Sequence, residues 1–165
     1  MNKVKKAATV FFNGDLYCLI TQSIGMIAFG DQSVAPQFLP PTVDDVTLGQ
    51  TLRFCLEKSR QVDMSEFQSI VSAGKLGEVD EAFEKITKQN YGYKTKRAMY
   101  KNMLCCWIME VDGKIKIIPT HHKSLDTYSG ISKEGTEILY LSVSALDTEF
   151  GESLREGFKR CTSAV

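Results

Sequence analysis

One segment of the chain, residues 91–101, concentrates side chains that could bind an anion or an aromatic group. Within eleven residues it holds four cations and three tyrosines: Lys94, Lys96, Arg97, Lys101, Tyr91, Tyr93 and Tyr100. Lysine and arginine bind phosphates and carboxylates, and tyrosine is common at the centre of protein interfaces. If the segment is helical, Arg97 and Lys101 share a face because they are four residues apart. The pattern predicts either a surface that binds a partner or a solvated helix face beside half-buried tyrosines.

The chain has only two histidines, His121 and His122, and either one could act as a general acid or base. Adjacent side chains of an extended chain point to opposite faces, so the two rings are poorly placed to chelate one metal ion. Catalysis would also require a group that orients the imidazole, and Asp126 is the next carboxylate in the sequence. We therefore predict a structural or interface role for both histidines, with no catalytic residue and no metal site.

The cysteine content indicates a reduced protein. There are five cysteines and no CxxC pair: Cys18, Cys55, Cys105, Cys106 and Cys161. A catalytic thiol needs a neighbouring base or a cationic environment that lowers its pKa. Cys105 and Cys106 lie in a strand-forming run, so one thiol faces each side of the predicted sheet, and we expect both to be buried as small apolar side chains. An odd number of unpaired thiols fits a cytoplasmic location.

The composition is that of a globular domain without net charge. The 165 residues are 43% hydrophobic and 24% charged, which is sufficient for a single domain over residues 1–165. Acidic and basic residues balance at 20 each, whereas a general nucleic-acid binder usually carries a basic excess. The chain has no phosphate-binding glycine loop and no HExxH, GxSxG or EF-hand pattern. Since no apolar run approaches the roughly 18 residues of a membrane span, we expect no membrane contact, and no cofactor or direct nucleic-acid binding either.

The elements that must position these residues begin with two hairpins. Five strands are predicted, over residues 7–12, 15–20, 105–111, 114–118 and 137–143. Asn13-Gly14 separates the first two and Asp112-Gly113 the next two, and both dipeptides favour the positive φ angles of a two-residue turn. Trp107, the only tryptophan, is expected to pack in the core. Consecutive hairpins indicate antiparallel pairing.

Apolar residues at helical spacing predict the remaining elements. Helices are expected over residues 47–60, around residues 67–74, over residues 78–90 and from about residue 147. The first shows a capping-box pattern in which Thr47 caps and Gln50 reaches back. The last carries an apolar stripe of Phe150, Leu154, Phe158 and Cys161. Residues 23–38 are expected to be irregular. The predicted class is α+β: a single-domain antiparallel sheet of about five strands with helices packed against it.

Several blocks of the sequence resemble bacterial contact-dependent growth inhibition (CDI) immunity proteins. The most specific are residues 91–98, 100–103 and 119–122, joined by residues 8–14, 38–41 and 154–161. The resemblance implies an α+β fold with a central antiparallel sheet. It also implies a cytoplasmic protein that is not an enzyme and that neutralises the toxin domain of its own cell's secreted exoprotein, expected to be a nuclease. A sheet of such a protein is expected to accept a strand or hairpin from the toxin.

The leading hypothesis is therefore an immunity protein that forms a one-to-one complex with the C-terminal toxin domain. Its candidate partner-binding residues are Tyr91, Tyr93, Lys94, Lys96, Arg97, Tyr100, Lys101, His121 and His122. An inhibitor that mimics nucleic acid would be acidic, so the contact could instead use the acidic stretches 44–84 and 134–156. Two other functions stay open: a small hydrolase or nuclease that uses His121 or His122, and a nucleic-acid-binding module that uses the segment Tyr91–Lys101.

Overall fold

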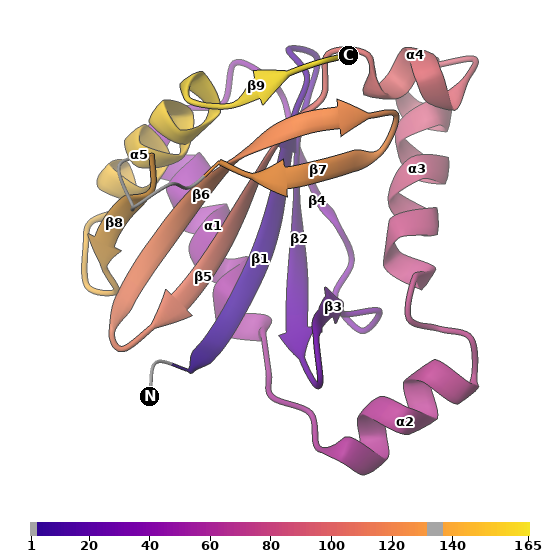
Figure 1. Cartoon of the computed structure of the whole chain (residues 1–165). Helices are drawn as coiled ribbons and strands as arrows, with labels where there is room; N and C mark the ends of the chain where they lie inside the picture. Colours follow the sequence, from indigo (N-terminus) through magenta and orange to yellow (C-terminus); the bar gives the residue numbers. More distant parts are fainter. Residues whose placement is uncertain (1–2, 132–136) are drawn as a thin grey trace.

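The computed structural model describes residues 3–131 and 137–165 (Figure 1). Along the chain, the elements are β1 (Val4–Phe12), β2 (Tyr17–Ile24), β3 (Ala28–Gly30), β4 (Gln37–Leu39), α1 (Asp45–Lys58), α2 (Met64–Ser72), α3 (Glu78–Tyr91), α4 (Lys96–Tyr100), β5 (Leu104–Val111), β6 (Lys114–Ser124), β7 (Thr127–Gly130), β8 (Leu139–Ser142), α5 (Asp147–Lys159) and β9 (Thr162–Ser163). All helices expected from the sequence are present, and the short helix α4 lies within the tyrosine- and lysine-rich segment.

The strands form one curled sheet in the order β3-β2-β1-β5-β6-β7, with β4 paired to β2 and both β8 and β9 paired to β6. Every pair is antiparallel except β6 with β9. The α+β class is confirmed, but the predicted number of about five strands is wrong, since the described residues form nine. The four additional strands, β3, β4, β7 and β9, span only two to four residues each. Such short runs carry no periodicity and are held by pairing with β2 or β6.

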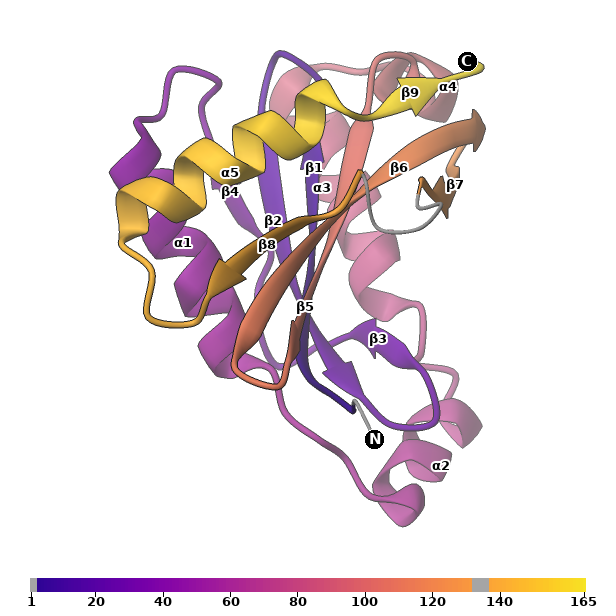
Figure 2. The same cartoon turned by 60° about the vertical axis from the view of Figure 1, so that its left-hand side comes forward.

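Helices α1 and α5 cover one face of the sheet (Figures 1 and 2). Strand residues that point to this face, such as Val10, Ile108 and Ile117, are fully buried among the apolar side chains of the two helices. Burying such side chains contributes about 1.5–3 kcal/mol each. The predicted stripe of the last helix is confirmed, with Phe150 and Leu154 in this core.

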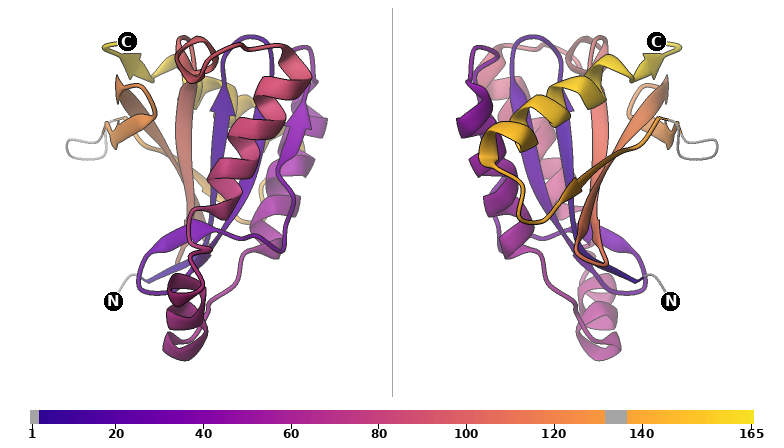
Figure 3. Two further views of the ribbon diagram at one scale, coloured as in Figure 1. Left: turned by 90° about the vertical axis from the view of Figure 1, so that its right-hand side faces the viewer. Right: turned by 90° about the vertical axis from the view of Figure 1, so that its left-hand side faces the viewer.

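Helices α3 and α4 cover only part of the opposite face (Figure 3). Phe83 of α3 stacks on Phe11 of β1, with 4.7 Å between the ring centroids, and Met99 of α4 is buried beside them. Helix α2 extends beyond the end of the sheet, where Phe67 packs against Phe29 of β3. The uncovered part of this face lies between α3 and the β6–β7 hairpin.

The first hairpin turn and the start of α1 both differ from the sequence-based expectation. The pair next to the first turn is Phe12↔Tyr17, so the loop contains four residues rather than the expected Asn13-Gly14 alone. The side-chain oxygen of Asn13 accepts hydrogen bonds from the backbone N–H groups of the next residues, which stabilises the longer loop. Helix α1 begins at Asp45 because Asp44 caps it, accepting a hydrogen bond of 2.7 Å from the Thr47 N–H.

The second predicted hairpin turn is confirmed. Asp112 and Gly113 have φ angles of +51° and +74°, and β5 and β6 pair on either side of them. Strand β6 is longer than expected and continues through Pro119 to Ser124. It pairs with β5 as far as Pro119 and with β7 from Thr120 onward, so the proline lies where β6 changes partner. This change of partner allows the end of β6 to curl away from the sheet with β7.

Asp31 makes the stability of the β2–β3 region depend on pH. Burial alone would raise the pKa of its carboxyl, but hydrogen bonds from Ser23 and Ser33 and the charge of Arg60 hold that pKa below its usual value. Since the folded pKa is lower than the unfolded value of about 3.9, the carboxylate stabilises the fold above about pH 4. This contribution is lost as the pH falls through the folded pKa.

We therefore expect Asp31→Asn to lower the free energy of unfolding at pH 7 by about 1–3 kcal/mol, the usual cost of a lost buried hydrogen-bonded group. Urea unfolding at pH 7 and at about pH 3 measures the effect. The difference between wild type and variant is expected to narrow at the lower pH, because below the unfolded pKa of about 3.9 the unfolded wild-type chain takes up a proton that the folded carboxylate resists. An equal difference at both pH values would contradict this role of Asp31.

Candidate partner-binding site

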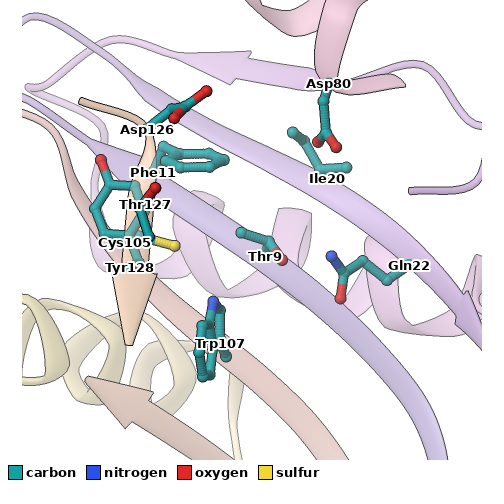
Figure 4. Close-up of a pocket in the computed structure, with 10 residues that line it drawn as sticks. All are labelled: Thr9, Phe11, Ile20, Gln22, Asp80, Cys105, Trp107, Asp126, Thr127 and Tyr128. Carbon is teal, nitrogen blue, oxygen red and sulfur yellow. The ribbon is translucent and has the colours of Figure 1, made fainter. Parts of the chain in front are cut away.

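The uncovered face of the sheet contains a cleft of about 350 Å³ between α3 and the β6–β7 hairpin (Figure 4). Ten residues line it: Thr9, Phe11, Ile20, Gln22, Asp80, Cys105, Trp107, Asp126, Thr127 and Tyr128. The strand residues among them alternate with those that face α1 and α5, because successive side chains of a strand point to opposite faces. Thr9 of β1 and Trp107 of β5 are direct cross-strand partners. The cleft is therefore built on the central pair of strands.

The walls of the cleft are acidic. Figure 4 shows Asp80 of α3 and Asp126 of the β6–β7 turn on opposite sides of the cleft, above Thr9, Gln22 and Trp107. The Lys96 ammonium binds the Asp126 carboxylate at 2.8 Å, whereas the Asp80 side chain has no hydrogen bond or ion pair among the described residues. Partial desolvation, and then the negative charges of Glu84 and Asp126, raise the pKa of Asp80. A cationic or hydrogen-bond-donating group would relieve this repulsion.

Trp107 gives the cleft its largest aromatic surface. It is half-buried and lines the cleft, so the expectation that it packs in the core is wrong. The reason is that, of the helices in the described residues, α3 and α4 cover this face of the sheet, and neither reaches β5 at this position. A cleft that offers both an aromatic ring and a carboxylate suits lysine or arginine side chains of a partner, through cation–π contact and ion pairs.

The exposed residues of the segment 91–101 remain candidates for contact with a partner. Thr95 caps α4, accepting a hydrogen bond of 3.0 Å from the Ala98 N–H. Lys94, Arg97 and Lys101 are exposed and form no ion pair within the described residues. Lys96 is half-buried and bridges Glu84 of α3 and Asp126 of the β6–β7 turn. This bridge joins α3, α4 and the hairpin.

The tyrosines of this segment differ in accessibility. Tyr91 is exposed, and Tyr93 is half-buried, where its hydroxyl accepts a hydrogen bond of 2.7 Å from Asn13. Tyr100 is only 4% exposed, and its hydroxyl donates a hydrogen bond of 2.9 Å to Glu84. The prediction that Tyr100 contacts a partner is therefore corrected, since the ring packs beneath α3. The signal that misled the prediction was composition, which does not show which face of a helix is covered.

The two histidines point to opposite faces, as expected from their positions in a strand. His121 lies beside β9, with its Nδ1 2.7 Å from the Thr162 hydroxyl. His122 is 1% exposed, stacks on Tyr128 with 4.4 Å between the ring centroids, and places its Nε2 2.7 Å from the Leu125 carbonyl oxygen. His122 therefore cannot contact a partner in this structure, which corrects that assignment. It instead fixes the conformation of the β6–β7 hairpin.

These contacts give no support to the hydrolase alternative. Neither histidine forms a hydrogen bond with a carboxylate among the described residues, and the Asp126 carboxylate is held by Lys96. Over residues 3–131 and 137–165, no group of three or more histidine, cysteine, aspartate or glutamate side chains is arranged to hold a metal ion. In the same ranges, no helix has the length and apolar character needed to cross a membrane.

The cysteines are free in the structure, and four of them are buried. Cys106 faces α5 and Cys105 faces the cleft, as predicted for neighbours in a strand. Burial raises the pKa of Cys18, Cys55, Cys105 and Cys106. Cys161 is only partly buried, and the hydrogen bond between its sulfur and that of Cys106, 3.7 Å away, lowers its pKa.

We therefore expect Cys161 to react with iodoacetamide faster than the other four cysteines, by at least about tenfold at pH 8, because alkylation requires an accessible thiolate. Peptide mapping by mass spectrometry on the folded protein measures the rates, and urea should equalise them. A Cys161→Ser variant should lack the fast reaction. Equally fast labelling of Cys18 in the folded wild type would contradict the structure.

The architecture defines an α+β protein with an open, acidic cleft on one face of a curled sheet. A family model described as CDI immunity protein matches residues 6–161. The immunity protein CdiI-YPIII of Yersinia pseudotuberculosis serotype O:3 (strain YPIII) is 30% identical over 175 residues, covering 98% of this chain and 99% of the relative. The chain belongs to the CDI immunity protein (CdiI) family.

Solved structures agree with this assignment. A chain of the CdiA-CT/CdiI toxin and immunity complex from Yersinia pseudotuberculosis superimposes with a TM-score of 0.87 and 27% identity, covering 98% of this chain and 100% of that chain. A protein of unknown function from Neisseria meningitidis also has a TM-score of 0.87, with 28% identity and coverage of 95% of both chains. The likeness therefore extends over nearly the whole fold.

Proposed function

We propose that this chain binds and neutralises the C-terminal toxin domain of a cognate CDI exoprotein, in a one-to-one complex and without catalysing a reaction. The observation that carries this proposal is family membership over residues 6–161, supported by the similarity to a chain of a toxin and immunity complex. It would act in the cytoplasm of the cell that makes the toxin. On family resemblance, we expect the toxin to be a nuclease.

The cleft and the adjacent edge of the sheet are the proposed centre of the contact. Strand β7 ends the sheet order, so its outer backbone N–H and C=O groups can pair with an incoming strand. The same hairpin forms one wall of the cleft, where Asp80 and Trp107 can receive side chains of that strand. Seven of the residues expected from the sequence to bind the partner remain accessible, and one of them, Lys96, binds Asp126 of the cleft. The seven are Tyr91, Tyr93, Lys94, Lys96, Arg97, Lys101 and His121.

Protection of cells tests the proposed function. The C-terminal toxin domain of the exoprotein encoded beside this chain would be induced in bacteria that also express the chain, and survival counted. Survival is expected to rise by several orders of magnitude with this chain and not with an unrelated CDI immunity protein. Killing that continues at equal levels of both proteins would refute neutralisation.

The same assay separates binding from catalysis. His121→Ala removes the accessible histidine, and toxin that is bound to this variant is expected to stay neutralised because the proposed mechanism needs no acid–base group. Loss of protection by a folded His121→Ala variant that still binds the toxin would favour an enzymatic role instead.

A further inference from the structure

A second depression lies beside the acidic cleft, and we call it the α4 groove. It has a volume of about 620 Å³ and lies between α4, Leu125 of the β6–β7 turn and Val165 of the C-terminal segment. Figure 1 shows the C-terminal segment and α4 close together at the same end of the molecule. Three cations of α4 and its cap, Lys96, Arg97 and Lys101, also line the groove. Its charge is therefore opposite to that of the cleft.

The cations of the groove are not equivalent. Lys96 forms ion pairs with Glu84 and Asp126, so its charge is already compensated. Arg97 and Lys101 are exposed and have no ion pair among the described residues. They are four residues apart across the end of α4, which places both side chains on one side of the helix. Two uncompensated positive charges thus remain at the rim of the groove.

The floor of the groove is apolar. The side chains of Leu125 and Val165, which line it, are 40% and 51% exposed. The alkyl stems of lysine and arginine extend this surface while their charged groups stay in water. An apolar floor with a cationic rim matches an acidic segment that also carries a large apolar side chain. A nucleic-acid backbone would leave the apolar floor exposed.

We propose that the α4 groove docks an acidic segment of the toxin domain, with carboxylates paired to Arg97 and Lys101 and one apolar side chain resting on Leu125. This inference rests on the proposed function and adds a second contact surface to it. The Lys96–Asp126 ion pair forms the wall between the groove and the cleft, since Lys96 lines one and Asp126 the other. A partner that spans both must present opposite charges in a fixed order, which discriminates against other toxins.

The test is the double charge reversal Arg97→Glu/Lys101→Glu, with the cognate toxin domain as the probe. We expect the Kd to rise at least about 100-fold, because like charges facing each other in an interface cost several kcal/mol. The salt dependence of binding should also become weaker. The matched control is Lys114→Glu/Lys159→Glu, which changes the net charge equally at exposed positions outside the groove and should alter the Kd less than about threefold.

The outcomes separate this inference from the proposed function. If the wild type does not bind the toxin domain, the proposed function fails. If both wild type and Arg97→Glu/Lys101→Glu bind equally well, only the groove assignment fails. A 20-base-pair DNA duplex and a 20-nucleotide RNA serve as alternative probes. Binding of either by the wild type, abolished by the double reversal, would show a nucleic-acid site and overturn the groove assignment.

Leu125→Ala should weaken toxin binding about fivefold, and no effect would refute the apolar anchor.

Discussion

Replacing Gly151 with alanine is expected to lower the free energy of unfolding by at least about 3 kcal/mol, the upper end of the usual cost of overpacking. A Cβ atom at this position would lie 2.1 Å from the backbone oxygen of Asp45 in α1. The reciprocal contact is as close, since a Cβ on Gly49 would lie 1.9 Å from the Asp147 oxygen. Helices α1 and α5 therefore cross backbone to backbone, and an added methyl group can be accommodated only by separating them.

The two helices cannot separate without further loss. Arg53 binds Asp147 at 2.8 Å and Arg155 binds Asp45 at 2.6 Å, so an ion pair spans the crossing in each direction. Arg155 also donates a hydrogen bond of 2.9 Å to the Tyr17 hydroxyl. Moving α5 outward would break these contacts and expose the face that carries Phe150 and Leu154. Gly49→Ala should therefore cost as much as Gly151→Ala.

Urea unfolding followed by circular dichroism measures both variants. The control is Gly77→Ala, where φ is −99° and no atom lies within 4 Å of the added Cβ. Its cost should stay below about 1 kcal/mol, the usual effect of alanine at a helix N-cap. If Gly151→Ala and Gly77→Ala unfold at the same urea concentration, the close crossing of α1 and α5 is wrong.

Trp107→Ala is expected to weaken binding of the toxin domain by at least about 30-fold, which corresponds to the 2 kcal/mol that defines a hot spot. Trp107 is the largest side chain of the cleft, and Asp80 lines the same cleft from α3. A partner side chain inserted there would exchange water for contact with the indole ring. Asp80→Lys places a positive charge at the same site and should weaken binding by at least about tenfold.

Two controls accompany the affinity measurements on Trp107→Ala and Asp80→Lys. Phe54→Ala removes a 40% exposed aromatic side chain from α1, on the opposite face of the sheet, and should leave the Kd unchanged within about threefold. Thermal unfolding of each variant shows whether the fold is retained. Asp80→Lys changes a surface position whose side chain has no hydrogen bond to the rest of the described structure. Full affinity in folded Trp107→Ala and Asp80→Lys variants would place the contact elsewhere on the surface.

Local sequence patterns predicted the long elements of the fold and missed the short ones. The turn dipeptides located the hairpins that contain β1 and β5, and apolar residues at helical spacing located α3, which ends at Gly92 with a φ of +74°. Strands β3 and β4 could not be predicted because three residues carry no period, and only pairing with β2 orders them.

The cleft could not be predicted from local sequence patterns, because it is formed by residues that are far apart in the sequence. Thr9, Asp80, Trp107 and Asp126 come from four parts of the chain, and none belongs to a recognisable motif. One feature of the sequence pointed to the cleft. Side chains alternate along a strand, so Thr9 and Trp107 lie on the face of β1 and β5 opposite to the one that packs against α1 and α5. Converting that signal into a site required knowing that α3 leaves these strands uncovered.

The basic segment illustrates the opposite case. It was conspicuous in the sequence, and the structure divides it by burial: Tyr100 packs in the core, Lys96 links α3 to the hairpin, and Arg97 and Lys101 remain exposed. Composition identified the segment, while the roles of its members depend on which face of a helix of five residues is covered.

Isothermal titration calorimetry of the purified chain with the purified cognate toxin domain tests the central claim most directly. We expect a stoichiometry of one to one and a Kd below about 10⁻⁷ M, as for other stable complexes that bury about 800 Å² per partner. Absence of binding at micromolar concentrations, with both proteins folded, would contradict the account.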